Sequence, residues 1–187
     1  MIREQNETSR KSSGELDRGL DYFNLVLRNI DINDMNDLKF CVNAWLKGYN
    51  ASKVCEQIPH HIYNHYQRKI ILYLLSHKHT KILCSKTDPL HKGGFINYEV
   101  VDGIYCLHYI YIIKSYKQFG LGEQLLQASG WGGSGVYSHT TWVMGKFGSK
   151  FNLFYNPYIL MEVINDNDTK VQDVCHSSYE GEDGEVL

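Results

Sequence analysis

The feature that most constrains the fold is an apolar run that ends in a glycine-containing turn. Residues 105–113 read YCLHYIYII, with little alternation of polar and apolar side chains. A strand of this kind is typical of the centre of a sheet, where both faces are covered. The hexapeptide KQFGLG (117–122) follows, and Leu121, Leu125 and Leu126 then have helical spacing. This segment therefore predicts a central strand, a tight turn and an amphipathic helix.

Further elements are predicted on both sides of this segment. Strands are expected at 21–30, 81–86, 93–103, 136–142 and 158–164, helices after Asn33 or Asp34 and from Pro59 as the first helical residue, and a short helix or irregular turn at 145–151. Asp102-Gly103 marks a hairpin turn. A strand, turn, helix and strand in succession require a right-handed parallel crossover, so we expect a mixed α/β sheet of about six or seven strands with helices on both faces.

Composition narrows the class of protein. The chain has 187 residues, 43% hydrophobic residues and a net charge of −2. This fits one globular domain at 20–166, between a flexible N-terminal arm (1–19) and a polar, acidic C-terminal tail (167–187). No basic excess points to nucleic acid as the main partner, and no run reaches the roughly 18 apolar residues of a membrane span. Five cysteines without a C-x-x-C pair indicate reduced thiols in the cytoplasm, and the polar start is not a signal peptide.

The KQFGLG turn can be interpreted in two ways. A helix N-terminus presents unpaired backbone N–H groups and a partial positive charge, which stabilise a phosphate group. Glycine at Gly120 and Gly122 leaves room for a pyrophosphate to approach, and Lys114 and Lys117 add positive charge. The alternative is that the two glycines serve only the geometry of a strand-to-helix turn. The dinucleotide-binding pattern fits less well, because the third glycine is missing and the turn does not follow the first strand.

With these residues in view, the stretch LHYIYIIKSYKQFGLGEQLLQ and the order of elements resemble the GCN5-related N-acetyltransferase (GNAT) superfamily. The resemblance implies a GNAT-like fold in which the fourth strand leads into a Q/R-x-x-G-x-G/A loop that holds the pyrophosphate of acetyl-CoA. Lys117, Gly120 and Gly122 occupy the pattern positions, with lysine in place of Gln or Arg. The implied cofactor contacts lie on this loop and on the fourth strand: Ile110, Ile112, Lys117, Gln118, Phe119, Gly120, Leu121 and Gly122.

The sequence is also similar to small GNAT-like proteins of tailed bacteriophages. Those proteins have a Y-[ST]-H-x-T segment and then a Y-N-P-Y segment, and this chain has YSHTT (137–141) and YNPY (155–158). The resemblance implies an acetyltransferase in the cytoplasm of an infected bacterium. The alternative is a non-catalytic virion component, such as a portal or neck ring protein that keeps the GNAT fold. A homo-oligomer or a multi-subunit assembly with phage portal or neck proteins is expected.

The implied reaction needs a base that takes the proton of the amine and an acid that protonates the leaving thiolate. The strand at 105–113 has no Asp or Glu, so His108, Glu99 on the preceding strand and His139 are the candidates for the base. Tyr155 and Tyr158 are the candidates for the acid. Each has an alternative, because a histidine on an apolar strand is usually a hydrogen-bonded core residue, and a tyrosine usually packs. Tyr137 is a weaker candidate for the acid.

Two other histidine patterns are set aside. His61 and His65 share a helix face at i, i+4, but no third ligand is evident, so no metal site is expected. Ser138 and His139 are adjacent in a predicted strand. Because neighbouring strand residues point to opposite faces, they are not expected to form a hydrogen-bonded pair.

Overall fold

The computed structural model describes residues 20–51 and 56–160. Its elements are, in chain order, β1 (Leu25–Asn29), α2 (Met35–Asn50), α3 (His60–His77), β2 (His79–Ser85), β3 (Lys92–Val101), β4 (Ile104–Ile112), η2 (Lys114–Tyr116), α4 (Leu121–Ala128), β5 (Gly135–Tyr137), α5 (Trp142–Lys150), β6 (Leu153–Tyr155) and η3 (Pro157–Leu160). None of the helices in this part of the chain has the length and apolar character that crossing a membrane requires.

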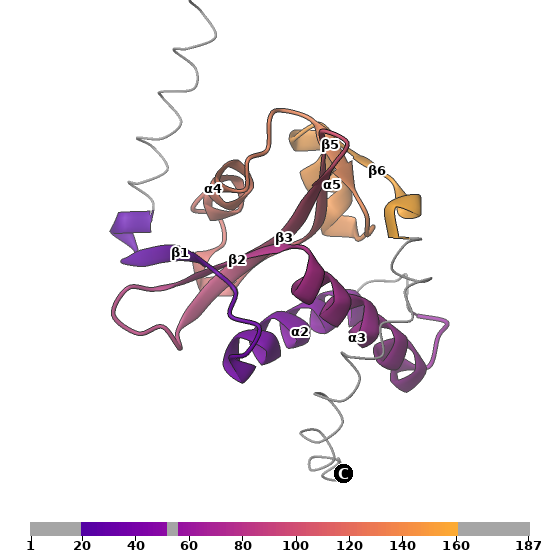
Figure 1. The fold of residues 1–187 in the computed structure, drawn as a ribbon, viewed down its shortest axis with the longest axis horizontal. Helices are drawn as coiled ribbons and strands as arrows, with labels where there is room; N and C mark the ends of the chain where they lie inside the picture. The colour runs from indigo at the N-terminus through magenta and orange to yellow at the C-terminus, as the bar shows by residue number, and fades with distance from the viewer. Residues whose placement is uncertain (1–19, 52–55, 161–187) are drawn as a thin grey trace, which may run out of the picture.

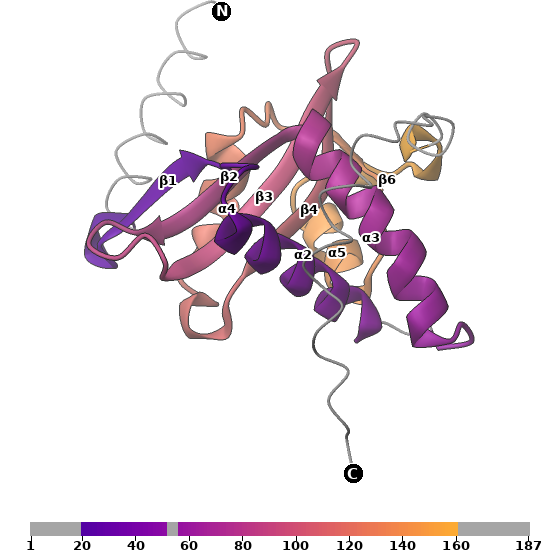
Figure 2. The same cartoon turned by 60° about the horizontal axis from the view of Figure 1, so that its bottom comes forward.

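The described strands form one six-stranded sheet in the order β1-β2-β3-β4-β5-β6. The pairs from β1 to β4 are antiparallel, and β4–β5 and β5–β6 are parallel. Helices α2 and α3 cover one face of the sheet, and α4 and α5 lie on the opposite side (Figures 1 and 2). The expected mixed α/β sheet with helices on both faces is therefore confirmed.

Two apolar clusters hold these layers together. On one face, Trp45, Ile71 and Leu74 from α2 and α3 pack with Phe95 of β3, all fully buried. On the other face, Leu121 and Leu126 of α4 pack with β3 and β4. Because both faces of the central strands are covered, β4 needs the almost continuous apolar sequence that predicted it.

A buried ion cluster fixes the start of α2 against the sheet. Asp34 caps the helix by accepting a hydrogen bond from the N–H of Asn36, as predicted for this residue type. Asp37, fully buried, accepts two hydrogen bonds from Arg28 of β1, at 2.5 and 2.8 Å, and lies 3.2 Å from Lys92 Nζ of β3. This carboxylate thus joins α2 to two strands.

A β-bulge in β4 interrupts the regular pairing with β3 at one histidine. Asn97 pairs with Tyr109 and Tyr98 pairs with Leu107, so His108 is the extra residue on β4. Leu107 packs in the α4 cluster, whereas Tyr109 packs in the α2 and α3 cluster. The bulge therefore reverses which alternate residues of β4 face α4, and His108 lies at the point of reversal.

Several predicted boundaries were wrong. The strand expected at 21–30 is confined to β1, and Pro59 is the N-cap of α3 rather than its first residue. The strand expected at 136–142 ends at Tyr137, because Thr141 caps α5 by accepting a hydrogen bond from Met144 N–H. The strand expected at 158–164 begins as η3, and the rest of that range lies outside the described residues, as do the predicted terminal arm and acidic tail. The short strand β6 was not predicted.

Candidate acyl-transfer site

The central strand is open along part of one edge. Strand β5 pairs with β4 at only two positions, Cys106↔Val136 and Leu107↔Tyr137, and the Ser138 N–H donates the last bond of this ladder to Leu107 O at 3.1 Å. Beyond that point no residue of β5 pairs with β4. The two strands therefore separate along the second half of β4.

Backbone groups of β4 face this gap. Ile113 N–H donates to Gly93 O of β3 at 2.9 Å. Because hydrogen-bonding direction alternates along an antiparallel strand, the N–H and C=O groups of Ile112 and Ile110 point away from β3, toward the gap. The side chains of Ile110 and Ile112 pack in the α4 cluster. Both residues named from the resemblance thus present main-chain groups to the place where an extended ligand would add as a strand.

Among residues 20–51 and 56–160, none covers the start of α4 at Gly120. Gly120 is the N-cap of α4, has a φ of 73° and makes no side-chain capping bond. A Cβ atom built on Gly120 meets nothing within 4 Å. Gln118 also has a positive φ, of 74°. Lys117, Gln118 and Phe119 are exposed, while Leu121 is buried and anchors the helix. Gly120 therefore takes a left-handed conformation that suits glycine, and the first N–H groups of α4 are not blocked by its own cap.

A buried polar network lies at the apex of the gap. It joins side chains from α3 and its C-cap, from β3 and β4, and from the segment after β5: Gln67, Lys78, Glu99, His108, Ser138 and His139. At its centre, His108 Nε2 lies 2.9 Å from Glu99 Oε1 and His108 Nδ1 lies 2.8 Å from Ser138 Oγ. Glu99, His108 and Ser138 are all buried. Two candidates for the base, Glu99 and His108, are thus in direct contact.

The network continues at both ends. Ser138 Oγ lies 2.7 Å from His139 Nδ1, and His139 Nε2 lies 3.5 Å from Gln67 Nε2 of α3. At the other end, Lys78 Nζ lies 2.7 Å from Glu99 Oε2. The prediction that Ser138 and His139 cannot bond was wrong, because Ser138 already lies outside the strand and the alternation of faces no longer applies. Sequence reasoning set Ser138 aside on this ground, although the adjacent Ser-His pair was the available signal, and it missed Gln67 and Lys78 because nothing near them in the chain points to this network.

Hydrogen-bond donors and acceptors can be assigned along this network. An ionised Glu99 only accepts, so a neutral His108 donates its Nε2–H to Glu99 and accepts at Nδ1 from the Ser138 hydroxyl group. Ser138 has then used its one proton, so it accepts from His139 Nδ1–H, and His139 Nε2 is left to accept from the side-chain amide of Gln67. With both rings neutral, all the donors point toward Glu99.

Two pKa shifts describe the ends of the network. Burial and the nearby His108 lower the pKa of His139 to about 3, so this ring is neutral near pH 7. Burial alone would raise the pKa of Glu99, but the hydrogen bonds from His108 and Lys78 outweigh it and hold the pKa below its ordinary value. Glu99 is therefore an ionised acceptor at one end, and His139 is a neutral ring at the other.

The network does not offer a good metal site. Glu99, Cys106 and His108 bring one ligand atom each to within 4.8 Å of one another. However, both nitrogens of His108 already have partners, and the Lys78 ammonium group bonds to Glu99. Burial also raises the pKa of the Cys106 thiol to about 12, which keeps it protonated. A cation would have to displace these contacts.

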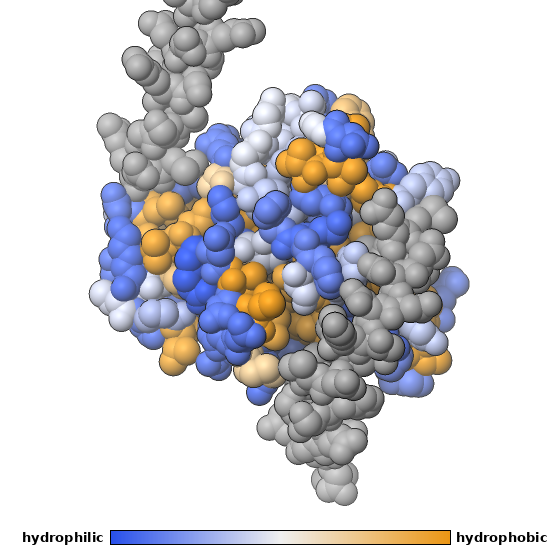
Figure 3. Space-filling view, in the orientation of Figure 1, coloured by the Kyte–Doolittle hydropathy of each residue, from blue (hydrophilic) through white to orange (hydrophobic). Residues whose placement is uncertain are grey.

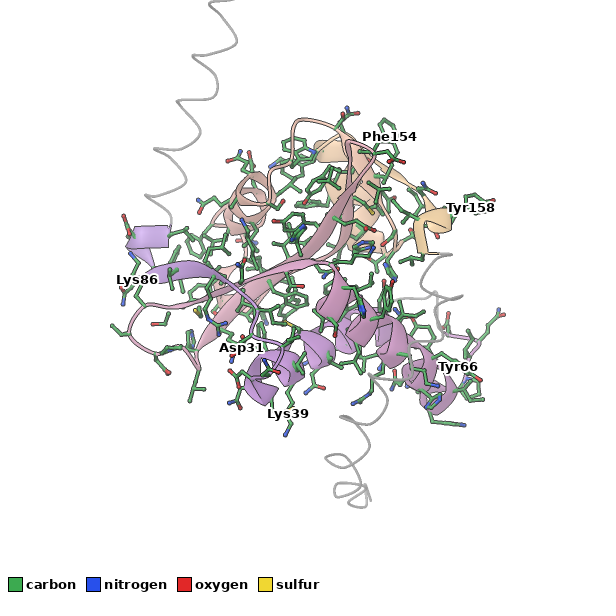
Figure 4. The ribbon with its side chains drawn as sticks, viewed as in Figure 1. Asp31, Lys39, Tyr66, Lys86, Phe154 and Tyr158 are labelled. Atoms are coloured by element: carbon green, nitrogen blue, oxygen red, sulfur yellow. The ribbon has the colours of Figure 1, made fainter. Side chains whose placement is uncertain are left out.

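The two tyrosines named as acids lie at the surface. Tyr155 is in β6 and is 48% exposed, and its ring centroid is 5.5 Å from that of Tyr137. Tyr158 is in η3, is 74% exposed and projects from the molecule away from the sheet (Figure 4). Neither residue contacts the polar network within the described structure. The role of Tyr155 or Tyr158 as an acid stays a prediction.

A shallow groove of about 310 Å³ borders the open part of β4 on the face covered by α2. Tyr111 of β4 and Phe40 and Ala44 of α2 form its apolar part, and Lys39, Asn43 and Lys47 its polar part. Figure 4 shows Lys39 extending from α2 toward solvent. The groove and the start of α4 thus lie on opposite sides of the same strand.

Comparisons with known proteins give similarity in structure alone. No model of a protein family matches the sequence, and no curated protein matches it. A Staphylococcus aureus protein assigned to the GNAT acetyltransferases has a TM-score of 0.42 and 18% identity, over 55% of this chain and 86% of that one. PaiA N-acetyltransferase of Thermoplasma acidophilum, solved with coenzyme A, has a TM-score of 0.39 and 16% identity, over 57% of this chain and 69% of that one. A Deinococcus radiodurans protein assigned as an acetyltransferase has a TM-score of 0.42 and 11% identity, over 68% of this chain and 80% of that one. Identities and TM-scores are low, so no residue role is transferred from these proteins.

Proposed function

We propose that this chain is an acyl-CoA-dependent N-acetyltransferase. The observation that carries the proposal is the gap between β4 and β5, which opens beside the uncapped start of α4. An extended pantetheine arm would pair with the main chain of Ile110 and Ile112, and the pyrophosphate would lie at Gly120 with Lys117 nearby. Acetyl-CoA would supply the acyl group as a thioester.

The acceptor amine would approach from the groove beside Tyr111. The reaction forms an amide bond, breaks the thioester C–S bond and moves a proton from the amine nitrogen to the sulfur. A base that takes this proton contributes typically 10²–10⁴-fold in rate. Glu99 and His108, in contact at 2.9 Å at the apex of the gap, are the groups proposed for this role. Tyr155 and Tyr158 remain the proposed sources of the proton for the thiolate.

Titration calorimetry with acetyl-CoA tests the proposal. We expect saturable binding, and we expect Gly120→Glu to abolish it, because a carboxylate would then occupy the anion position. Gly103→Glu is a matched control, since Gly103 also has a positive φ, of 77°, and open space around its Cβ, but lies in the β3–β4 hairpin. If Gly103→Glu, which strains the backbone in the same way, still binds acetyl-CoA, the loss of binding in Gly120→Glu is due to the site itself. A flat titration of the unaltered protein at millimolar acetyl-CoA would rule the proposal out.

A non-catalytic role in a tailed-phage particle is the alternative, suggested by the YSHTT and YNPY segments. Exposed aromatic side chains on β6 and η3, Phe154 at 64%, Tyr155 at 48% and Tyr158 at 74%, would suit contact with another subunit. Apolar side chains are exposed among polar ones on the face seen in Figure 3. This role predicts rings of the purified protein or its co-sedimentation with virions, and a monomer absent from particles would contradict it.

A further inference from the structure

The polar network has a single direction. Starting at Gln67, each donor points to the next acceptor through His139, Ser138 and His108 as far as Glu99. The three inner contacts measure 2.7, 2.8 and 2.9 Å. A row of short hydrogen bonds with one orientation allows protons to hop in that direction without any side chain moving far. The ionised Glu99 sets this direction, because a neutral imidazole has one donor and one acceptor nitrogen and the serine hydroxyl group has one proton.

The two ends of the network differ. At one end, the contact between His139 Nε2 and Gln67 is the longest of the network, at 3.5 Å. His139 is half-buried, whereas Ser138 and His108 are buried, so His139 is nearer to the surface. The opposite end is the ionised Glu99 carboxylate, which Lys78 stabilises at 2.7 Å. The His139 end can therefore exchange its partner, and the Glu99 carboxylate is the only pure acceptor at the other end.

The His139 end also lies where the chemistry is proposed. Ser138 follows the last hydrogen bond of the β4–β5 ladder, and His139 follows Ser138. The His139 ring packs against Trp45 and Tyr49 of α2, at centroid distances of 5.8 and 5.4 Å. The ring thus packs against the buried face of α2, next to the point where β4 and β5 separate.

We infer that His139, Ser138 and His108 form a proton relay that carries the proton of the acceptor amine to Glu99. The inference rests on the proposed function and adds Ser138 and His139 to its machinery. The amine proton binds to His139 Nε2 in place of the Gln67 contact. The Nδ1 proton of His139 moves to Ser138 Oγ, the Ser138 proton moves to His108 Nδ1, and the Nε2 proton of His108 moves to Glu99. One proton enters at His139 Nε2 and one is added to Glu99, so charge and atoms balance.

Collapse of the tetrahedral adduct then runs the relay backward. Glu99 returns its proton to His108 Nε2, each inner proton moves back by one site, and His139 Nε2 gives its proton to the leaving thiolate. The relay ends in its starting state, ready for another turnover. His139 Nε2 would therefore act first as the base and then as the acid, and it replaces Tyr155 and Tyr158 as the proposed source of the thiolate proton.

The relay predicts imidazole tautomers in the protein without any ligand. Nitrogen-15 NMR of the histidine rings should find His139 as the Nδ1–H tautomer and His108 as the Nε2–H tautomer. The opposite tautomer at His139 would reverse the direction of the network and overturn the inference. Because this measurement uses no acetyl-CoA, its result is independent of whether the protein binds that substrate.

Ser138→Ala breaks the relay and leaves both histidines in place. With acetyl-CoA and a panel of spermidine, glucosamine and a lysine-containing peptide, thiol release should show a loss in kcat of about 100-fold, within the range of general base catalysis, with KM little changed. Ser138→Thr, which keeps the hydroxyl group, should restore most of the rate. The solvent deuterium isotope effect on kcat should be larger in the unaltered protein than in Ser138→Ala.

Ser129→Ala is the control for loss of a buried hydroxyl group. Ser129 is 6% exposed, against 2% for Ser138, and bonds to Tyr105 at 2.6 Å in the α4 cluster, away from the relay. It should lower stability but not kcat. If acetyl transfer occurs and Ser138→Ala keeps its rate, the relay is wrong and the proposed function stands. If acetyl-CoA does not bind, the proposed function fails and takes the catalytic role of the relay with it.

Discussion

Replacing Asp37 with asparagine should lower the free energy of unfolding by about 3–5 kcal/mol, the cost of breaking a buried ion pair from one side. Asp37 is fully buried and accepts hydrogen bonds from Arg28, from Lys92 and from the backbone N–H of Asp31. Asparagine has nearly the same shape, so the change removes the charge and one acceptor oxygen without opening a cavity.

The magnitude follows from the exposure of the two cations. The side chain of Arg28 is 32% exposed and can regain water, whereas that of Lys92 is 4% exposed and cannot. Hydrogen bonds to charged groups contribute roughly 1.5–3 kcal/mol each, and the Lys92 ammonium group would stay buried without its counter-charge. Since whole domains are stable by about 5–15 kcal/mol, this single change could remove a large share of the total.

Urea unfolding followed by circular dichroism measures the loss. Glu123→Gln is the matched control, because the Lys150–Glu123 pair has side chains that are 66% and 41% exposed and should contribute less than about 1 kcal/mol. Adding Lys92→Met to Asp37→Asn should recover part of the stability by removing the unpaired cation. A loss below about 1 kcal/mol for Asp37→Asn, no larger than that of the control, would refute the reasoning.

The Asp37 carboxylate should also make the free energy of unfolding depend on pH. Burial would raise the pKa of Asp37, but hydrogen bonds from Arg28, Asp31 and Lys92 hold it below the ordinary value of 3.8. A depressed folded-state pKa gives stability that is present above the unfolded-state value and is lost as pH falls through the folded-state value. The stability difference between the unaltered protein and Asp37→Asn should therefore shrink below about pH 4. A difference that stays constant down to pH 2 would contradict this.

Three further changes test the packing, each by urea unfolding. A Cβ atom at Gly48 would meet Tyr109 Oη at 2.0 Å, so Gly48→Ala should destabilise by about 1–3 kcal/mol despite the better helix propensity of alanine, and Tyr109→Phe in the same chain should relieve much of this. Leu126→Ala, at a fully buried position, should cost about 2–5 kcal/mol, whereas Leu90→Ala, at 68% exposure, should stay within about 0.5 kcal/mol. Thr141→Ala, which removes the N-cap of α5, should cost about 1 kcal/mol, and Thr141→Ser should not.

Local chemistry explains which elements could be predicted. Asp34 as a cap, Asp102-Gly103 as a hairpin and Gly120 at the start of a helix each act through their nearest neighbours in the chain. The turn at Asp102-Gly103 has φ values of 50° and 77°, which this residue pair tolerates well. Features of this kind follow from a few residues, so the sequence alone was enough to predict them.

The candidate site depends on tertiary contacts and was predicted only in part. Glu99 and His108 could be named because their residue types suit proton transfer, but their contact needs the pairing of β3 with β4 and the bulge at His108. Ser138 was set aside because its strand was expected to continue, whereas the cap at Thr141 starts a helix soon after Tyr137. No local pattern fixes where a parallel strand stops pairing with its neighbour.

The short ladder between β4 and β5 has a mechanical consequence. Two residue pairs join these strands, and the last main-chain bond between them runs from Ser138 N–H to Leu107 O. A longer ladder would fix the angle between β4 and β5, whereas so few main-chain bonds leave this angle to other contacts. Helices α4 and α5 share one apolar cluster, and Phe147 of α5 lies 3.7 Å from a Cβ built on Gly122 of α4, so a molecule inserted between the strands would have to act against this packing.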